Sequence, residues 1–145
     1  MDETKKIEWC ENILQITGPA EDLARFKTKA AAHSPSCQQE LGEAPGVLSF
    51  NSLVPIPAEL LTADRERLRE WERQEWGCEW GVCHPVISAE ADQFLEYRFL
   101  TESKPPLAFL ERASRSWPAL GFILAYRNHL AYDHASAKAG HSCLV

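Results

Sequence analysis

The sequence lacks long apolar runs, a secretory leader and clustered positive charge. No apolar run in its 145 residues approaches the ~20 residues of a membrane-spanning helix. Residues 1–6 are followed by no apolar h-region, so we expect no secretory signal. The formal net charge is −6, and non-specific nucleic-acid binding depends on clustered Lys and Arg. We therefore expect a cytoplasmic protein with no membrane partner, and nucleic acid is a disfavoured partner.

The motifs of common catalytic and nucleotide-binding sites are also missing. The chain has no G-x-S-x-G elbow, no G-x-G-x-x-G loop and no Walker-type phosphate loop. Cys83 and His84 are adjacent, and neighbouring side chains of a strand point to opposite faces, so they form a poor thiolate–imidazole pair. We therefore predict no catalytic residues, no cofactor and no enzymatic activity.

Five cysteines are present, an odd number that favours reduced thiols over a disulfide framework. Cys78, Cys83 and His84 form a C-x4-C-H sequence, which one further ligand would complete as a tetrahedral zinc set. The candidates for that ligand are His129, His134, His141 and Cys143. The spacing is looser than the C-x2-C of a zinc ribbon, so we favour cysteines acting as small core residues and predict no stoichiometric metal. A small zinc-binding protein is the alternative.

Hydrophobic periodicity divides the chain into strands and helices. A period of two marks four strands, at residues 7–17, 47–57, 94–101 and 120–127. Apolar stripes at helical spacing mark three helices, at residues 19–32, 58–76 and 105–117. Residues 82–87 predict a short strand or an extended connection, and residues 88–93 a polar turn. In the tail, residues 129–134 predict an extension of the last strand or a hairpin arm, and residues 135–140 a loose segment.

The order of these elements predicts an α+β fold. Without the second helix it is βαββαβ, the ferredoxin-like arrangement, with helices on one face of a four-stranded antiparallel sheet. The second helix is then an insertion between the second and third strands. The length predicts a single domain over residues 1–145, with a core at about 8–127 and a C-terminal extension at 128–145.

The most distinctive stretch is EWGCEWG at residues 75–81, in which two tryptophans are each followed by glycine. Trp is costly to leave in water, and Gly lets the backbone turn or approach closely. Aromatic clusters more often form core than site, so we expect Trp76 and Trp80 to be structural first. The alternative is an aromatic floor of a binding site.

Four stretches, read together, carry a family resemblance. They are WCENILQITG at 9–18, FNSLVPIP at 50–57, WGCEW at 76–80, and the segment from the proline pair at 105–106 to the Trp-Pro pair at 117–118. In order and spacing they resemble the YubB-type ferredoxin-like domain family, small proteins of phages and plasmids, over roughly residues 8–127. The family's usual Thr-Lys pair between the tryptophans is Cys78-Glu79 here, which removes a positive charge. The resemblance implies the fold and a mobile-element origin in a bacterial host cell, and it implies no activity.

These observations predict a non-enzymatic protein that binds another protein. An antiparallel sheet with helices on one side leaves a face to be covered or used, and Trp and Tyr are frequent interface anchors. The candidate binding residues are Trp9, Asn12, Trp76, Gly77, Trp80 and Tyr126. The resemblance suggests a host or defence protein as partner, and a homodimer is the other use of that surface.

A sheet that binds single-stranded nucleic acid is a further alternative. Trp9 and Phe94 would supply its aromatic contacts. The K/R-G-F-type strand signature is absent, and the same face carries Glu96. We therefore place this alternative below protein binding.

Overall fold

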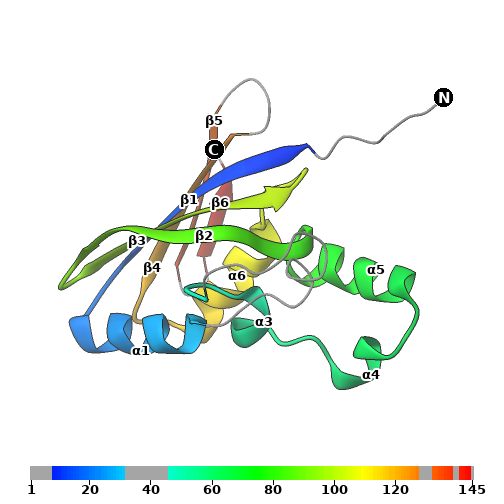
Figure 1. Cartoon of the computed structure of the whole chain (residues 1–145). Helices are drawn as coiled ribbons and strands as arrows, with labels where there is room; N and C mark the ends of the chain where they lie inside the picture. The colour runs from blue at the N-terminus through cyan, green and yellow to red at the C-terminus, as the bar shows by residue number, and fades with distance from the viewer. Residues whose placement is uncertain (1–7, 32–45, 128–131, 139–140, 145) are drawn as a thin grey trace.

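The computed structural model describes residues 8–31, 46–127, 132–138 and 141–144, with side chains described as far as Arg127. These residues form a mixed α+β fold in which the helices lie on one side of an antiparallel sheet (Figure 1). The strands are β1 Trp9–Thr17, β2 Glu79–Ala91, β3 Phe94–Glu102, β4 Gly121–Arg127, β5 Tyr132–Lys138 and β6 His141–Leu144. The helices are α1 Ala20–Ala30, α3 Phe50–Leu53, α4 Ala58–Leu61, α5 Arg65–Glu75 and α6 Leu107–Ser116.

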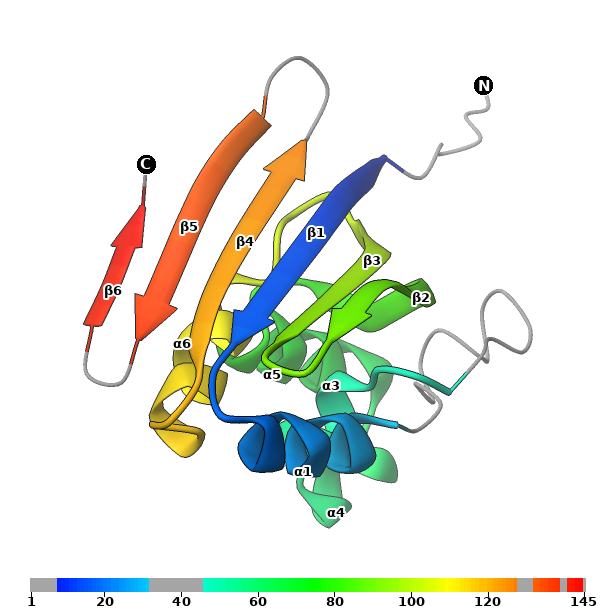
Figure 2. The ribbon, with the colours of Figure 1, turned by 90° about the vertical axis from the view of Figure 1, so that its left-hand side faces the viewer.

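The sheet has the strand order β2-β3-β1-β4-β5-β6, and each strand is antiparallel to its neighbours. Figure 2 shows this order across the sheet, with α1 and α6 beneath it. The predicted mixed class and antiparallel sheet are therefore confirmed. The predicted number of four strands is too low, because β5 and β6 extend the sheet beyond β4.

The central strand β1 follows the predicted alternation. Its even-numbered residues are at most 2% exposed and face the helices, while Trp9 and Ile13 lie on the opposite face. β3 and β4 repeat the pattern, so the three strands present one apolar face and one mixed face. Each apolar side chain that is buried in this way stabilises the fold by about 1.5–3 kcal/mol.

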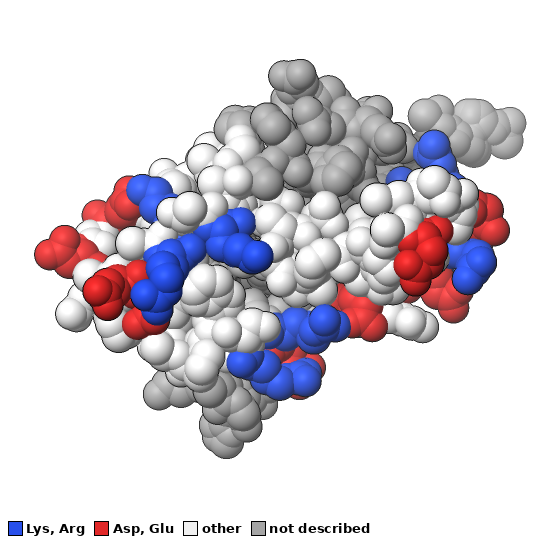
Figure 3. Space-filling view, turned by 90° about the horizontal axis from the view of Figure 1, so that it is seen from below, with Lys and Arg blue, Asp and Glu red and all other residues white. Residues whose placement is uncertain are grey.

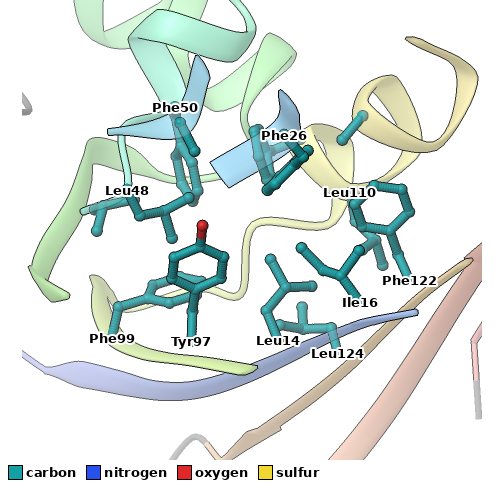
Figure 4. Packing of buried hydrophobic residues seen from close by; sticks show 14 of the residues in the cluster. Leu14, Ile16, Phe26, Leu48, Phe50, Tyr97, Phe99, Leu110, Phe122 and Leu124 are labelled. Atoms are coloured by element: carbon teal, nitrogen blue, oxygen red, sulfur yellow. The ribbon is translucent and has the colours of Figure 1, made fainter. Parts of the chain in front are cut away.

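The core between sheet and helices is rich in aromatic rings (Figure 4). Phe50 of α3 stacks on Phe109 of α6 with ring centroids 4.1 Å apart, and it meets Phe99 of β3 edge-on at 5.9 Å. Phe26 of α1 contacts Phe122 of β4 edge-on at 5.7 Å. Such pairs add about 0.5–1.5 kcal/mol beyond the area they bury. The rings thus fix α1, α3 and α6 to the same face of the sheet.

The predicted strand at residues 47–57 is wrong, because residues 50–53 form the short helix α3. The Ser49 hydroxyl accepts a hydrogen bond from the Ser52 amide at 3.2 Å and caps this helix. The Asn51 side chain accepts another from the Ile56 amide at 2.8 Å. Both bonds satisfy backbone groups locally, which is how Ser and Asn compete with a strand ladder.

The predicted helix at residues 58–76 is divided in two. The Asp64 carboxylate accepts a hydrogen bond from the Arg67 amide at 2.9 Å, so α5 begins at an N-cap in the middle of the predicted span. The position of the insertion is also corrected, because α3, α4 and α5 all precede β2. The inserted helices therefore lie between the first and second strands of the sheet.

The second strand is β2, which is longer than the short strand predicted at residues 82–87. It pairs with β3 as far as Ala91, so the polar turn predicted at 88–93 shrinks to Asp92 and Gln93. Pro85 is accommodated because β2 is an edge strand. Within the tail, residues 135–138 belong to β5, which corrects the loose segment predicted there, and residues 139–140 lie outside the described part.

Candidate functional site

The face of the sheet opposite the helices, called the open face below, carries a mixed set of side chains from three strands. Val86 of β2, Arg98 of β3 and Ile13 of β1 are register partners and form one row across it. Leu100 and Glu11 are partners in the next row. Cross-strand neighbours lie ~5 Å apart on one face, so these side chains form a continuous surface.

A shallow groove of about 280 Å³ follows these two rows. It is lined by Glu11, Asn12, Ile13, His84, Val86, Arg98, Phe99 and Leu100. Trp9 lies beside it and meets the His84 ring edge-on, with centroids 6.4 Å apart. The groove, called the open-face groove below, therefore combines an aliphatic floor with an arginine, a histidine and a glutamate.

An irregularity in β2 places His84 at this groove. The register with β3 shifts between Cys83 and Val86, and His84 has a positive φ of 53°. The shift leaves Cys83 fully buried and turns His84 out to the open face. A bulge that re-aims a side chain is typical of functional positions, and a non-glycine residue in the left-handed region costs about 1–3 kcal/mol. This strained position is the strongest local signal of function in the groove.

Hydrogen bonds and ion pairs organise the charges of the open face. Glu96 accepts hydrogen bonds from Gln15 at 2.8 Å and from Ser88 at 2.9 Å. These bonds, chiefly the one from Gln15, hold the pKa of Glu96 below its ordinary value. The Arg98 Nε lies 4.0 Å from the same carboxylate, which is beyond hydrogen-bond distance. Among the described residues, Arg98 therefore has donors left for another group.

Asn12 supports the groove from the covered side. Its amide donates to the Cys10 carbonyl at 3.1 Å and to the Thr101 hydroxyl at 3.0 Å, and it is 2% exposed. The Thr101 hydroxyl donates in turn to the Lys104 carbonyl at 2.6 Å. Burial raises the pKa of the neighbouring Cys10 thiol to about 11, so this thiol stays protonated at neutral pH. The side chain of Asn12, a predicted binding residue, thus ties β1 to β3 on the covered side, beneath the groove that Asn12 lines.

Trp76 belongs to the core, as expected. It is fully buried, and its indole N–H donates to the Val54 carbonyl at 3.0 Å. Gly77 follows with a φ of 92°, and a Cβ there would lie 3.0 Å from the Leu107 amide nitrogen. The Gly77 position therefore requires glycine for both its backbone angle and its space.

The buried Glu72 joins α5 to the start of β2. Its Oε1 accepts hydrogen bonds from Arg69 at 2.8 Å and from the Trp80 amide at 2.9 Å. Trp80 has a φ of 74° and is half-buried. The Trp-Gly stretch is thus a structural joint between α5, β2 and α6, and Trp76 offers no surface to a partner.

Tyr126 lies on the covered side of the sheet. It is the register partner of Asn12, whose side chain faces the helices, and it packs against the core. Of the six predicted binding residues, Asn12 lines the open-face groove and Trp9 lies beside it, whereas Trp76 is buried in the core and Tyr126 lies on the covered side. The alternation of β1 and β3 already placed Ile13 and Arg98 on that face. His84 could not be found in this way, because the bulge changes the phase of β2.

The proposed zinc ligands point in different directions. Cys78 and Cys83 are buried, whereas His84 is exposed. Desolvation raises the pKa of Cys78 well above its ordinary value, which disfavours a thiolate there. Among the described side chains, no group of three or more His, Cys, Asp or Glu residues could hold a metal ion. The tail candidates His129, His134, His141 and Cys143 lie outside the described side chains.

The helix-covered side offers a different kind of surface. Seen from that side, basic and acidic side chains lie next to one another (Figure 3). Arg25 pairs with Asp22, and Arg112 pairs with Glu75. Neighbouring charges of opposite sign leave little net field for a charged partner. None of the described helices has both the length and the apolar character needed to cross a membrane.

Comparisons of the chain with family models, with curated proteins and with solved structures each gave no match.

Proposed function

We propose that this chain is a non-enzymatic protein that binds another protein through the open-face groove. One observation carries the proposal. The described residues contain three exposed large hydrophobic side chains, and two of them, Val86 at 49% and Ile123 at 48%, lie on the open face. Val86 lines the groove, and Ile123 lies outside it on β4. Exposed apolar side chains in and near a groove are typical of interaction sites. Trp9 at the edge of the groove is the kind of residue that anchors interfaces.

The fold is proposed to be the ferredoxin-like βαββαβ arrangement of YubB-type domains. The strand order β2-β3-β1-β4, with α1 after β1 and α6 after β3, supports this assignment. The strands β5 and β6 and the helices α3 to α5 would then be additions to that core. The mobile-element origin, the cytoplasmic location and a host or defence protein as partner stay predictions of the resemblance.

Binding of single-stranded nucleic acid has less support. Trp9 and Phe94 lie at opposite ends of the β1–β3 ladder, so they cannot stack on neighbouring bases of one strand. Glu11 and Glu96 lie on the face between them, and carboxylates repel phosphates. Sub-micromolar binding of single-stranded DNA or RNA at low salt would favour nucleic-acid binding over protein binding.

The proposal is tested with two matched variants. Ile123→Asp places a charge on the open face, and Leu61→Asp places one at a side chain of α4 that is 58% exposed. We expect a bacterial lysate to yield proteins captured by the wild type and by Leu61→Asp but lost with Ile123→Asp. Circular dichroism checks that both variants are folded, and light scattering distinguishes a second copy from a different partner. Equal capture by both variants would contradict the proposal.

A further inference from the structure

The open-face groove places a positive charge among aliphatic side chains, which favours one class of ligand. Arg98 is flanked by aliphatic side chains on both neighbouring strands, Ile13 on β1 and Val86 on β2. A guanidinium within an aliphatic surface suits a ligand that carries a carboxylate directly on an apolar body. Leu100 continues the aliphatic floor along the next row.

Within the described part of the chain, Arg98 makes one long ion pair, to Glu96, and has donors left for such a carboxylate. Its side chain is 57% exposed, and its carboxylate neighbour among the described residues is Glu96, at 4.0 Å from Nε. Both Glu96 oxygens already accept hydrogen bonds, from Gln15 and from Ser88. Guanidinium groups carry five donors in a planar fork that matches a carboxylate. The fork of Arg98 therefore has unused donors over an apolar floor.

The remaining charged groups of the groove determine the orientation of the ligand. Glu11 lies at the β1 end, where its carboxylate is 3.8 Å from Arg127. His84 lies at the β2 end, exposed and edge-on to Trp9. Glu11 repels the carboxylate of such a ligand, which is accommodated between Arg98 and His84. The apolar group of the ligand then contacts Ile13 and Leu100.

We propose that the open-face groove binds the C-terminal residue of a polypeptide whose last side chain is apolar. The inference rests on the proposed protein-binding function and names the chemistry of the partner. In an extended segment, adjacent side chains point to opposite faces, and side chains on the same face are about 6.6 Å apart along the strand. An internal acidic residue therefore holds its carboxylate farther from an apolar side chain than a C-terminal residue does. A C-terminal apolar residue carries its carboxylate beside its own side chain, which matches cross-strand neighbours ~5 Å apart.

Three small probes test the proposal on the full chain by NMR titration of backbone amides and the Trp9 indole. N-acetyl-leucine carries an α-carboxylate, N-acetyl-leucinamide carries none, and N-acetyl-glutamyl-leucinamide carries a side-chain carboxylate. We expect N-acetyl-leucine to shift the signals of Trp9, His84 and Leu100. The two amides should bind at least about tenfold more weakly, because a charge-assisted pair is lost or misplaced. Equal binding of N-acetyl-leucine and N-acetyl-leucinamide, or shifts confined to other regions, would overturn the proposal.

Two variants assign the effect to Arg98. Arg98→Gln should weaken N-acetyl-leucine binding at least about tenfold, whereas Arg25→Gln, on the helix-covered side, should leave it unchanged. An unchanged affinity in Arg98→Gln would overturn the assignment. The test is separable from that of the proposed function. Capture of proteins without binding of N-acetyl-leucine would refute the C-terminal chemistry alone. Binding of N-acetyl-leucine without any captured protein would refute the protein-binding function and the polypeptide ligand, and would leave only the preference of the groove for an α-carboxylate on an apolar body.

Discussion

The two faces of the central sheet are built from the same strands and are stabilised differently. On the covered face, Leu14 and Leu124 are 1% exposed and belong to one continuous core. On the open face, Ile13 and Ile123 come from the neighbouring positions of the same strands and remain partly or largely exposed. Adjacent residues of a strand thus differ in role, because alternate side chains point into the core and toward solvent. Substitutions should therefore lower stability on one face and alter binding on the other.

The largest contrast is expected between two tryptophans. Trp76→Ala removes a fully buried indole and its hydrogen bond to Val54, so we expect a loss of about 3–5 kcal/mol in the free energy of unfolding. Trp9→Ala removes a half-buried ring whose contact is edge-on to His84, and about 1 kcal/mol is expected. Urea denaturation measures both values. Equal losses in the two variants would contradict the distinction between the core and the open face.

The buried charge at the joint of α5 and β2 should be almost as sensitive. Arg69→Ala removes the guanidinium that pairs with the fully buried Glu72, and breaking a buried pair typically costs about 3–5 kcal/mol. The exposed Arg67 on the same helix is the control, and Arg67→Ala should change stability by less than ~0.5 kcal/mol. Thermal melts compare the two. A small effect of Arg69→Ala would show that Glu72 is satisfied without its charge partner.

Adjacent residues of β4 give the most closely matched comparison. Leu124→Ala creates space in the core and should cost about 2–5 kcal/mol. Ile123→Ala acts on a side chain that is 48% exposed, and it should change stability by less than ~0.5 kcal/mol. The two variants change similar volumes on one strand, so chemical denaturation isolates the effect of the face. A cost for Ile123→Ala that approaches that of Leu124→Ala would mean that the open face is part of the core.

Much of this architecture follows from periodicity alone. The alternation in β1, β3 and β4 predicts which residues are buried, and the apolar stripe of α1 predicts its buried face. The stripe predicted for α6 is correct at Leu110 and Ala113 but misses the buried Phe109. These segments are regular, and their hydrophobic pattern agrees with their local preference. The prediction therefore succeeds where one face of an element meets the core throughout its length.

The prediction fails where side chains bond to nearby backbone or where the phase changes. Ser49 and Asn51 convert an apolar segment from strand to helix. In β2, the positive φ of Trp80 and His84 breaks the alternation, so the strand cannot be read from its pattern. The open-face groove is still harder to predict from the sequence. It is formed by three strands, and their register depends on pairing between segments that are far apart in the sequence.

The smallest expected effect is on the pH dependence of stability, through Glu96 on the open face. The pKa of Glu96 is lowered by its hydrogen bonds, so the ionised form stabilises the fold above the ordinary value of 4.5 and loses this contribution as pH falls through the folded pKa. Glu96→Gln should flatten the dependence of stability on pH in this acidic range, by less than about 1 kcal/mol. Denaturation at neutral pH and below 4.5 checks it. An unchanged slope in Glu96→Gln would mean that other carboxylates account for the acid sensitivity.

Site-specific photo-crosslinking in bacterial cells tests the central claim most directly. A benzoylphenylalanine is placed at position 123 on the open face or at position 61 on α4, since Ile123 and Leu61 are both exposed hydrophobic side chains. We predict a discrete crosslinked adduct from position 123 that disappears when Arg98→Gln is added, and none from position 61. Adducts from position 61 alone, or the same adducts from both positions, would contradict the claim that the open face is the binding surface.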